Sequence, residues 1–209
     1  MDNTLINQPD HRARLTALHR SSDNACVYRS LRASANLTDI STDTRCALPP
    51  GYQLIRVDEP QCQNRDVFEI ALLNDLEGSV VYHSRVSISV NPQMNGRHAA
   101  HSQAWCSPNA LHSAVMREVT WAVFFNYILD RFDARVLIGP ENWAGMHLWQ
   151  RQVSESIARG LYVYYLSPTG GQEYVPTQTA LNGLVDRLWS ESCEQNEHSM
   201  VISRIALCE

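Results

Sequence analysis

The sequence contains no lysine: all 17 of its Lys and Arg residues are arginine. Arginine can replace lysine in ion pairs, but without an ε-amino group the side chains of this protein cannot be acetylated or ubiquitinated at lysine. One explanation is a coding bias toward arginine. The other is a protein that carries out lysine modification or is exposed to it. The absence of lysine fits both explanations, and the second makes lysine modification a function to consider.

Other features are also missing. No hydrophobic run reaches the length of a membrane span, and the start MDNTLINQPD has no apolar core of a signal peptide. The net charge of −5 argues against nucleic-acid binding, which needs a basic face. The six cysteines form no CxxC pair and the eight histidines no HExxH motif, so we expect no metal. We expect a protein without a membrane span that is cytoplasmic, or secreted into a host cell without a classical signal peptide.

Residues 1–50 differ in composition from the rest of the chain. They contain no Gly, Trp or Phe, and Ser, Thr, Asn and Asp recur in them. We interpret them as a polar leader, either disordered or loosely docked, with short helices near 10–20 and 27–35. Pro49-Pro50-Gly51 marks its end. Delivered bacterial effectors and ordinary disordered tails both have such leaders, and residues 51–209 form the expected folded domain.

The remaining sequence alternates between strand and helix patterns. Alternating apolar residues predict strands at 52–57, 67–73, 80–90 and 98–105, with a hairpin turn at Glu77-Gly78. Helical spacing predicts a long helix at 108–132 and a second helix at 142–159, ended by Gly160. Shorter elements follow the same rules: strands at 135–138, 161–166 and 200–207, and a helix at 180–190. This order predicts an α/β fold in which antiparallel strands come first in the sequence and a βαβ unit follows them.

The stretch ENWAGMHLWQRQVSESIARGLYVYYL and the order of elements from His98 to Leu166 resemble the GNAT acyltransferase superfamily. The resemblance implies a GNAT-like α/β fold with a mixed, largely antiparallel sheet and flanking helices. It also implies that amides at the start of the long helix bind the pyrophosphate of acetyl-CoA or another acyl-CoA, in a cleft between two splayed strands. The acyl group would pass to an amine of a protein or small-molecule acceptor.

The resemblance also assigns site residues. The implied cofactor-binding residues are Arg97, Ala104, Trp105, Cys106, Asn109, Ala110, Leu111 and Asn142. Backbone amides near Ala104–Cys106 would polarise the thioester carbonyl. The family's general-acid tyrosine lies four residues before the glycine that ends the late helix, where this chain has Ser156. Ser156 or Tyr164 is therefore the expected acid, with Tyr162 and Tyr165 as alternatives. The glycine-rich phosphate loop of the family is replaced here by CSPNAL.

Two further sets of residues could carry chemistry. Glu118 on the long helix is a candidate general base, as are Glu69 and Glu141. Cys106 precedes a predicted helix start, which lowers the pKa of a thiol, and His83, His98, His101 and His112 are candidate partners. A cysteine-dependent hydrolase or transferase is thus one alternative function. A non-catalytic interaction protein on a GNAT-like fold is the other.

Overall fold

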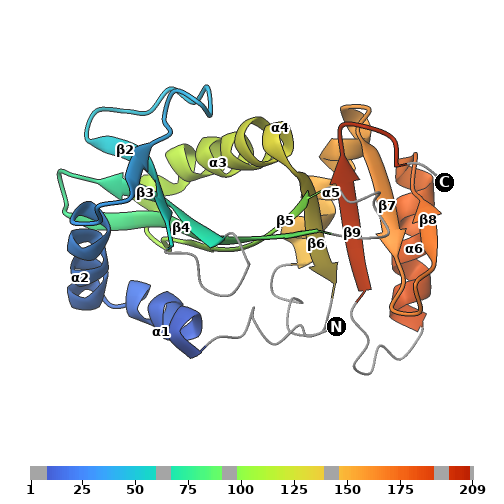
Figure 1. Ribbon diagram of the computed structural model, residues 1–209, viewed down its shortest axis with the longest axis horizontal. Helices are drawn as coiled ribbons and strands as arrows, with labels where there is room; N and C mark the ends of the chain where they lie inside the picture. The colour runs from blue at the N-terminus through green and yellow to red at the C-terminus, as the bar shows by residue number, and fades with distance from the viewer. Residues whose placement is uncertain (1–8, 60–66, 91–97, 139–145, 191–197, 208–209) are drawn as a thin grey trace. The chain divides into compact units, whose positions relative to one another are not determined.

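The computed structural model describes residues 9–59, 67–90, 98–138, 146–190 and 198–207 (Figure 1). The fold is mixed α/β, with an open and largely antiparallel sheet, as the sequence predicts. Packing divides the chain into two compact units. The first comprises residues 1–87 and 102–127, and the second residues 88–101 and 128–209.

The first unit is built on antiparallel strands. In order they are β1 (Leu37–Asp39), β2 (Tyr52–Asp58), β3 (Val67–Asn74) and β4 (Ser79–Val90), followed by β5 (His98–Cys106). Tyr52 pairs with Asn74 at the end of the β2–β3 ladder, and β3 and β4 form the predicted hairpin. Strands β4 and β5 each contribute residues to both units.

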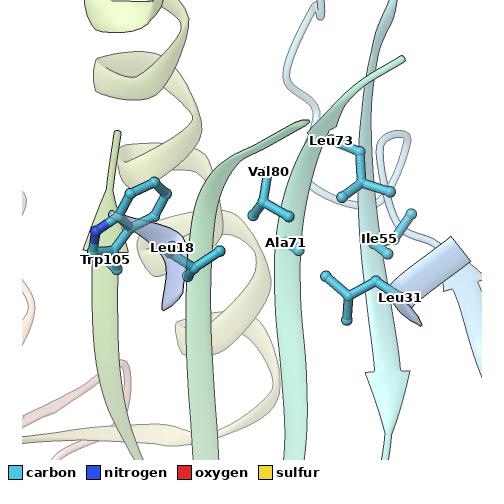
Figure 2. Close-up of a cluster of buried hydrophobic side chains, with 7 residues drawn as sticks. All are labelled: Leu18, Leu31, Ile55, Ala71, Leu73, Val80 and Trp105. Atoms are coloured by element: carbon cyan, nitrogen blue, oxygen red, sulfur yellow. The ribbon is translucent and has the colours of Figure 1, made fainter. Parts of the chain in front are cut away.

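Two helices from the predicted leader pack against these strands. Helices α1 (Pro9–Leu18) and α2 (Ser21–Arg32) lie on one side of them and α3 (Ser113–Ala122) on the other (Figures 1 and 2). Figure 2 shows the resulting core cluster, which consists of Leu18, Leu31, Ile55, Ala71, Leu73, Val80 and Trp105. Helices α1 and α2 thus group with the strands that follow Pro49-Pro50-Gly51, the boundary that the sequence predicts.

Asn24 ties the second of these helices to the sheet. Its Nδ2 donates to the carbonyl oxygens of Leu18 at 3.2 Å and Val80 at 3.0 Å, and its Oδ1 accepts from the Val80 N–H at 2.7 Å. Asn24 is buried, so water cannot satisfy its side-chain amide, and these three hydrogen bonds do so instead. Asn24 is one of the polar residues for which the sequence predicts a loose leader, and its side chain fastens α2 to the sheet.

The predicted long helix is continuous but not uniform. It opens with a 3₁₀ turn, η2 (Ala110–His112), and continues as α3. A π-helical segment, η3 (Val123–Ile128), follows, and α4 (Leu129–Arg131) ends the run. Val115, Val119 and Ala122 form the buried face of α3, as their helical spacing predicts.

The second unit contains the parallel strand pair of the fold. β5 pairs in parallel with β6 (Asp133–Ile138), from Ala99↔Asp133 to His101↔Arg135. The other strands are antiparallel and follow in the order β9 (His198–Ser203), β7 (Tyr162–Leu166) and β8 (Gln172–Tyr174). The helices are α5 (Met146–Ala158) and α6 (Gln178–Ser190), and a core cluster of Ala99, Tyr164, Leu166, Val201 and Leu207 holds the strands. None of the described helices is both long and apolar enough to cross a membrane.

Candidate functional site

Cys106 lies at the end of β5, beneath α3. The N–H of the next residue, Ser107, bonds to the Val81 carbonyl at 2.9 Å and so fixes the strand end against β4. The residue as a whole is exposed, but burial around its sulfur raises the pKa of the Cys106 thiol, and a hydrogen bond with Thr120 only partly offsets this. The raised pKa disfavours thiolate at neutral pH, whereas the sequence predicts the opposite.

Three of the four histidines proposed as partners for Cys106 have other described contacts, and the fourth, His98, is exposed at the start of β5. His112 contacts the Tyr52 hydroxyl through Nδ1 at 2.8 Å and Glu77 through Nε2 at 3.3 Å. His83 lies 3.5 Å from the Glu69 carboxylate through its Nε2. His101, in the second unit, contacts the Arg135 carbonyl through Nδ1 at 3.0 Å, and burial lowers its pKa. The geometry thus gives the cysteine-dependent alternative no support.

The start of the long helix uses most of its own amides. Asn109 is the N-cap, and its Oδ1 accepts from the Leu111 N–H at 3.0 Å. The Asn109 N–H donates to Ser107 Oγ at 3.3 Å, and the His112 N–H to the Asn109 carbonyl at 3.1 Å. Among the described contacts, the Ala110 N–H is the amide of this turn without an acceptor. An anion at this turn therefore has fewer free donors than the sequence suggests.

The other cofactor-binding residues are placed as follows. Ala104 is exposed, whereas Trp105 is only 7% exposed and belongs to the core cluster of Figure 2. The Trp105 indole N–H donates to His19 Nε2 at 3.2 Å, with the rings edge to face. Trp105 is therefore a packing residue that faces α1. Arg97 and Asn142 lie outside the described residues, as does the candidate base Glu141.

The candidate acids differ in whether their hydroxyl proton is free, and the candidate base Glu118 is exposed to solvent. Ser156 is fully buried, and its hydroxyl donates to the Gln152 carbonyl at 2.7 Å within α5, which commits its proton. Tyr164 accepts the Leu207 N–H at 3.2 Å, a bond that does not use its own proton. Glu118 is exposed on α3, and its charge adds to the burial that raises the pKa of Cys46. Tyr164 and Ser156 belong to the second unit, and Glu118 and Cys106 to the first.

One cluster of chemically active side chains was not predicted as a unit. Tyr52, His112 and Glu77 form a continuous chain of contacts, although 60 residues separate Tyr52 from His112. The sequence shows each residue at the boundary of an element but gives no signal that joins them. Among the residues that the structure describes, no group of His, Cys, Asp and Glu side chains could hold a metal ion.

Comparison with protein-family models and with curated proteins found no match to this chain. Any assignment of function therefore rests on the fold and on the chemistry of the residues above.

Proposed function

We propose that the protein is an acyl-CoA-dependent N-acyltransferase of the GNAT type, acting on an amine of a protein or small molecule. One observation carries the proposal: the order of the elements. Strand β5 leads through a helix to the parallel strand β6, then through α5 to β7, and β9 inserts antiparallel between β6 and β7. This is the succession of strand, helix, strand, helix and strand that the resemblance implies.

The chemistry is direct attack of a deprotonated amine on the thioester carbonyl. Backbone amides near Ala104–Cys106 polarise the carbonyl oxygen. Of the two hydroxyls that the resemblance assigns to the leaving thiolate, both in the second unit, Tyr164 keeps its own proton available, because Ser156 already donates to Gln152. The missing lysine fits an enzyme that cannot modify its own side chains, and it equally fits an effector delivered into a host cell.

Calorimetry with acetyl-CoA and free CoA tests the proposal. We expect binding in the micromolar range, about −8 kcal/mol, because few amides of the helix start remain free. Ala110→Pro removes the unpaired amide, and the first position of a helix tolerates proline. Asn109 before it is already extended, with φ −70° and ψ 119°, as a residue before proline must be.

We expect Ala110→Pro to weaken binding while the control Ala114→Ser, on the same helix, leaves it unchanged. Absence of heat at millimolar acetyl-CoA would show that the fold is not used in this way. The non-catalytic interaction protein would then be the better assignment.

A further inference from the structure

A second candidate reaction centre lies in the first unit, where His112 directly follows the helix-start residues assigned to acyl-CoA binding. Tyr52 begins β2, Glu77 lies in the turn between β3 and β4, and His112 ends the 3₁₀ turn before α3. The Tyr52 Oη to His112 Nδ1 distance is 2.8 Å, and the His112 Nε2 to Glu77 Oε2 distance is 3.3 Å. The two rings meet edge to face, with centroids 6.0 Å apart.

Backbone contacts hold these three segments in place. The Asp75 N–H donates to the Gly51 carbonyl at 2.7 Å, so the turn that carries Glu77 is fixed next to Tyr52. Gly51 has φ +84°, and a Cβ there would come within 2.6 Å of Leu76 Cγ. The positive φ favours glycine at this position. The geometry of the cluster is set by the backbone rather than by long mobile side chains.

The contacts fix the protonation pattern of the imidazole. We assign the proton of the neutral imidazole to Nε2, because a carboxylate oxygen of Glu77 lies 3.3 Å from it and can only accept a hydrogen bond. The Nδ1 then holds a lone pair and accepts the hydrogen of the Tyr52 hydroxyl. His112 is 4% exposed at its side chain, which holds the ring in this orientation. A carboxylate, an oriented imidazole and a hydroxyl in this sequence form the arrangement that activates an oxygen nucleophile.

The surroundings of the cluster indicate the kind of substrate. Burial and the negative charge of Glu77 raise the pKa of Tyr52, so its oxygen becomes nucleophilic only by passing the proton to His112. Leu76 and Leu111, the neighbours of Glu77 and His112 in sequence, are 81% and 82% exposed. Asp75 and Glu77 make the turn acidic, which disfavours phosphoryl groups and other anions. An uncharged acyl group with an apolar chain suits these conditions.

We propose that Tyr52, His112 and Glu77 form a nucleophilic site that accepts an acyl group from an activated ester with an apolar acyl chain. A bond forms between Tyr52 Oη and the carbonyl carbon, and the bond from that carbon to the leaving oxygen breaks. The phenolic proton moves to His112 Nδ1 and then to the leaving oxygen. Glu77 stabilises the imidazolium that exists between these transfers. The product is an O-acyl tyrosine, and the step needs no coenzyme A.

The test uses the full chain with p-nitrophenyl octanoate and no coenzyme A, followed by peptide mapping of the acylated tyrosines. Tyr174 is the internal reference: it is 48% exposed, and its described contacts are ring contacts with Tyr162 and Tyr164. We expect Tyr52 to be acylated at least about tenfold faster than Tyr174. We also expect p-nitrophenyl acetate to react more slowly than the octanoate, and equal rates would remove the apolar acyl chain from the proposal.

Three variants separate this role from a structural one. Tyr52→Phe removes the nucleophile, and His112→Gln should reduce acylation of Tyr52 to the level of Tyr174. Glu77→Gln keeps the shape of the turn and should slow the reaction at least about tenfold. Tyr28→Phe is the matched control, because the Tyr28 hydroxyl donates to Asp75 in the same turn at 2.8 Å without a histidine. This control should leave the rate unchanged.

The pH dependence provides a measurement on the unmodified protein. Activation by His112 gives acylation of Tyr52 that is already fast at neutral pH, whereas spontaneous ionisation of a tyrosine gives a rate that rises only near about pH 10. A rise near 10, or equal acylation of Tyr52 and Tyr174, would overturn the proposal. The cluster would then only fasten the β3–β4 turn to β2 and to the start of α3. The acylation assay contains no coenzyme A, so its result is read separately from the calorimetry with acetyl-CoA.

Discussion

Glu69 is a carboxylate in β3 that is only 5% exposed. Burial raises its pKa, but the hydrogen bond and charge of His83, together with Arg14 of α1, outweigh burial and lower the pKa to about 2. Arg14 binds the Glu69 carboxylate directly. A side chain from the polar N-terminal region thus neutralises a charge within the sheet. Glu69, a candidate general base in the sequence, is better explained as an anchor for α1.

The low pKa of Glu69 predicts how stability changes in acid. Because the folded pKa lies below the unfolded value of 4.5, the contribution of Glu69 is complete above about pH 4.5 and is lost as the pH falls toward 2. The loss corresponds to about 3 kcal/mol. Denaturant unfolding between pH 6 and pH 2.5 should show a steeper decline for the wild-type protein than for Glu69→Gln. Glu155→Gln, which removes an exposed pair with Arg159, is the control and should decline like the wild type.

The raised pKa of Cys106 predicts slow alkylation. Cys26 is exposed on α2, and its sulfur accepts a hydrogen bond from Arg29 at 3.1 Å. At pH 7.5 we expect iodoacetamide to modify Cys26 before Cys106, because burial keeps the Cys106 thiol protonated. Peptide mapping over time gives both rates in one sample. Modification of Cys106 first would restore the cysteine-dependent alternative.

At the scale of elements, α2 shows how a polar segment becomes part of a core. Leu31 is 2% exposed and belongs to the cluster shown in Figure 2, while most neighbouring residues of α2 are polar. The sequence predicts helices near 10–20 and 27–35, whereas the structure has them at Pro9–Leu18 and Ser21–Arg32, and the sequence does not predict their docking. Docking depends on Asn24, Leu18 and Leu31, whose partners lie in strands some 50 residues later. Short helical stripes in a polar segment do not identify such distant partners.

Leu31→Ala tests whether α2 is part of the core. We expect a loss of about 2–5 kcal/mol in the free energy of unfolding, because the substitution leaves a cavity beside the sheet. Leu76→Ala is matched in chemistry but lies at an 81% exposed position, and it should change stability by less than about 0.5 kcal/mol. Urea unfolding of the three proteins provides the comparison. Equal stability of Leu31→Ala and wild type would mean that the segment is removable, as composition alone predicts.

For the whole molecule, the local hydrophobic patterns of the sequence predict most helices and strands, but they do not predict which side chains meet in a cluster. The hairpin of β3 and β4 and the buried face of α3 follow from periodicity alone. Two short strands, β1 and β8, were missed because their three residues carry no alternating pattern. The π-helical turn η3 and the Asn109 cap decide which amides and side chains are available at the long helix. The Asn109 cap is a local bond between residues 109 and 111, whereas the chain of Tyr52, His112 and Glu77 depends on tertiary contacts.

The division of the chain has a consequence for its synthesis. Residues 88–101 of the second unit leave the ribosome before residues 102–127, which complete the first. The first unit therefore cannot finish folding until Tyr127 has emerged, and the β5 residues of the second unit wait still longer for their partner strand β6. No single cut of the gene yields either unit as one uninterrupted fragment. Nascent chains arrested after Tyr127 but before β6 should still expose the apolar residues Ala99 and Ala100 of β5, and engagement of chaperones should fall only once β6 has emerged.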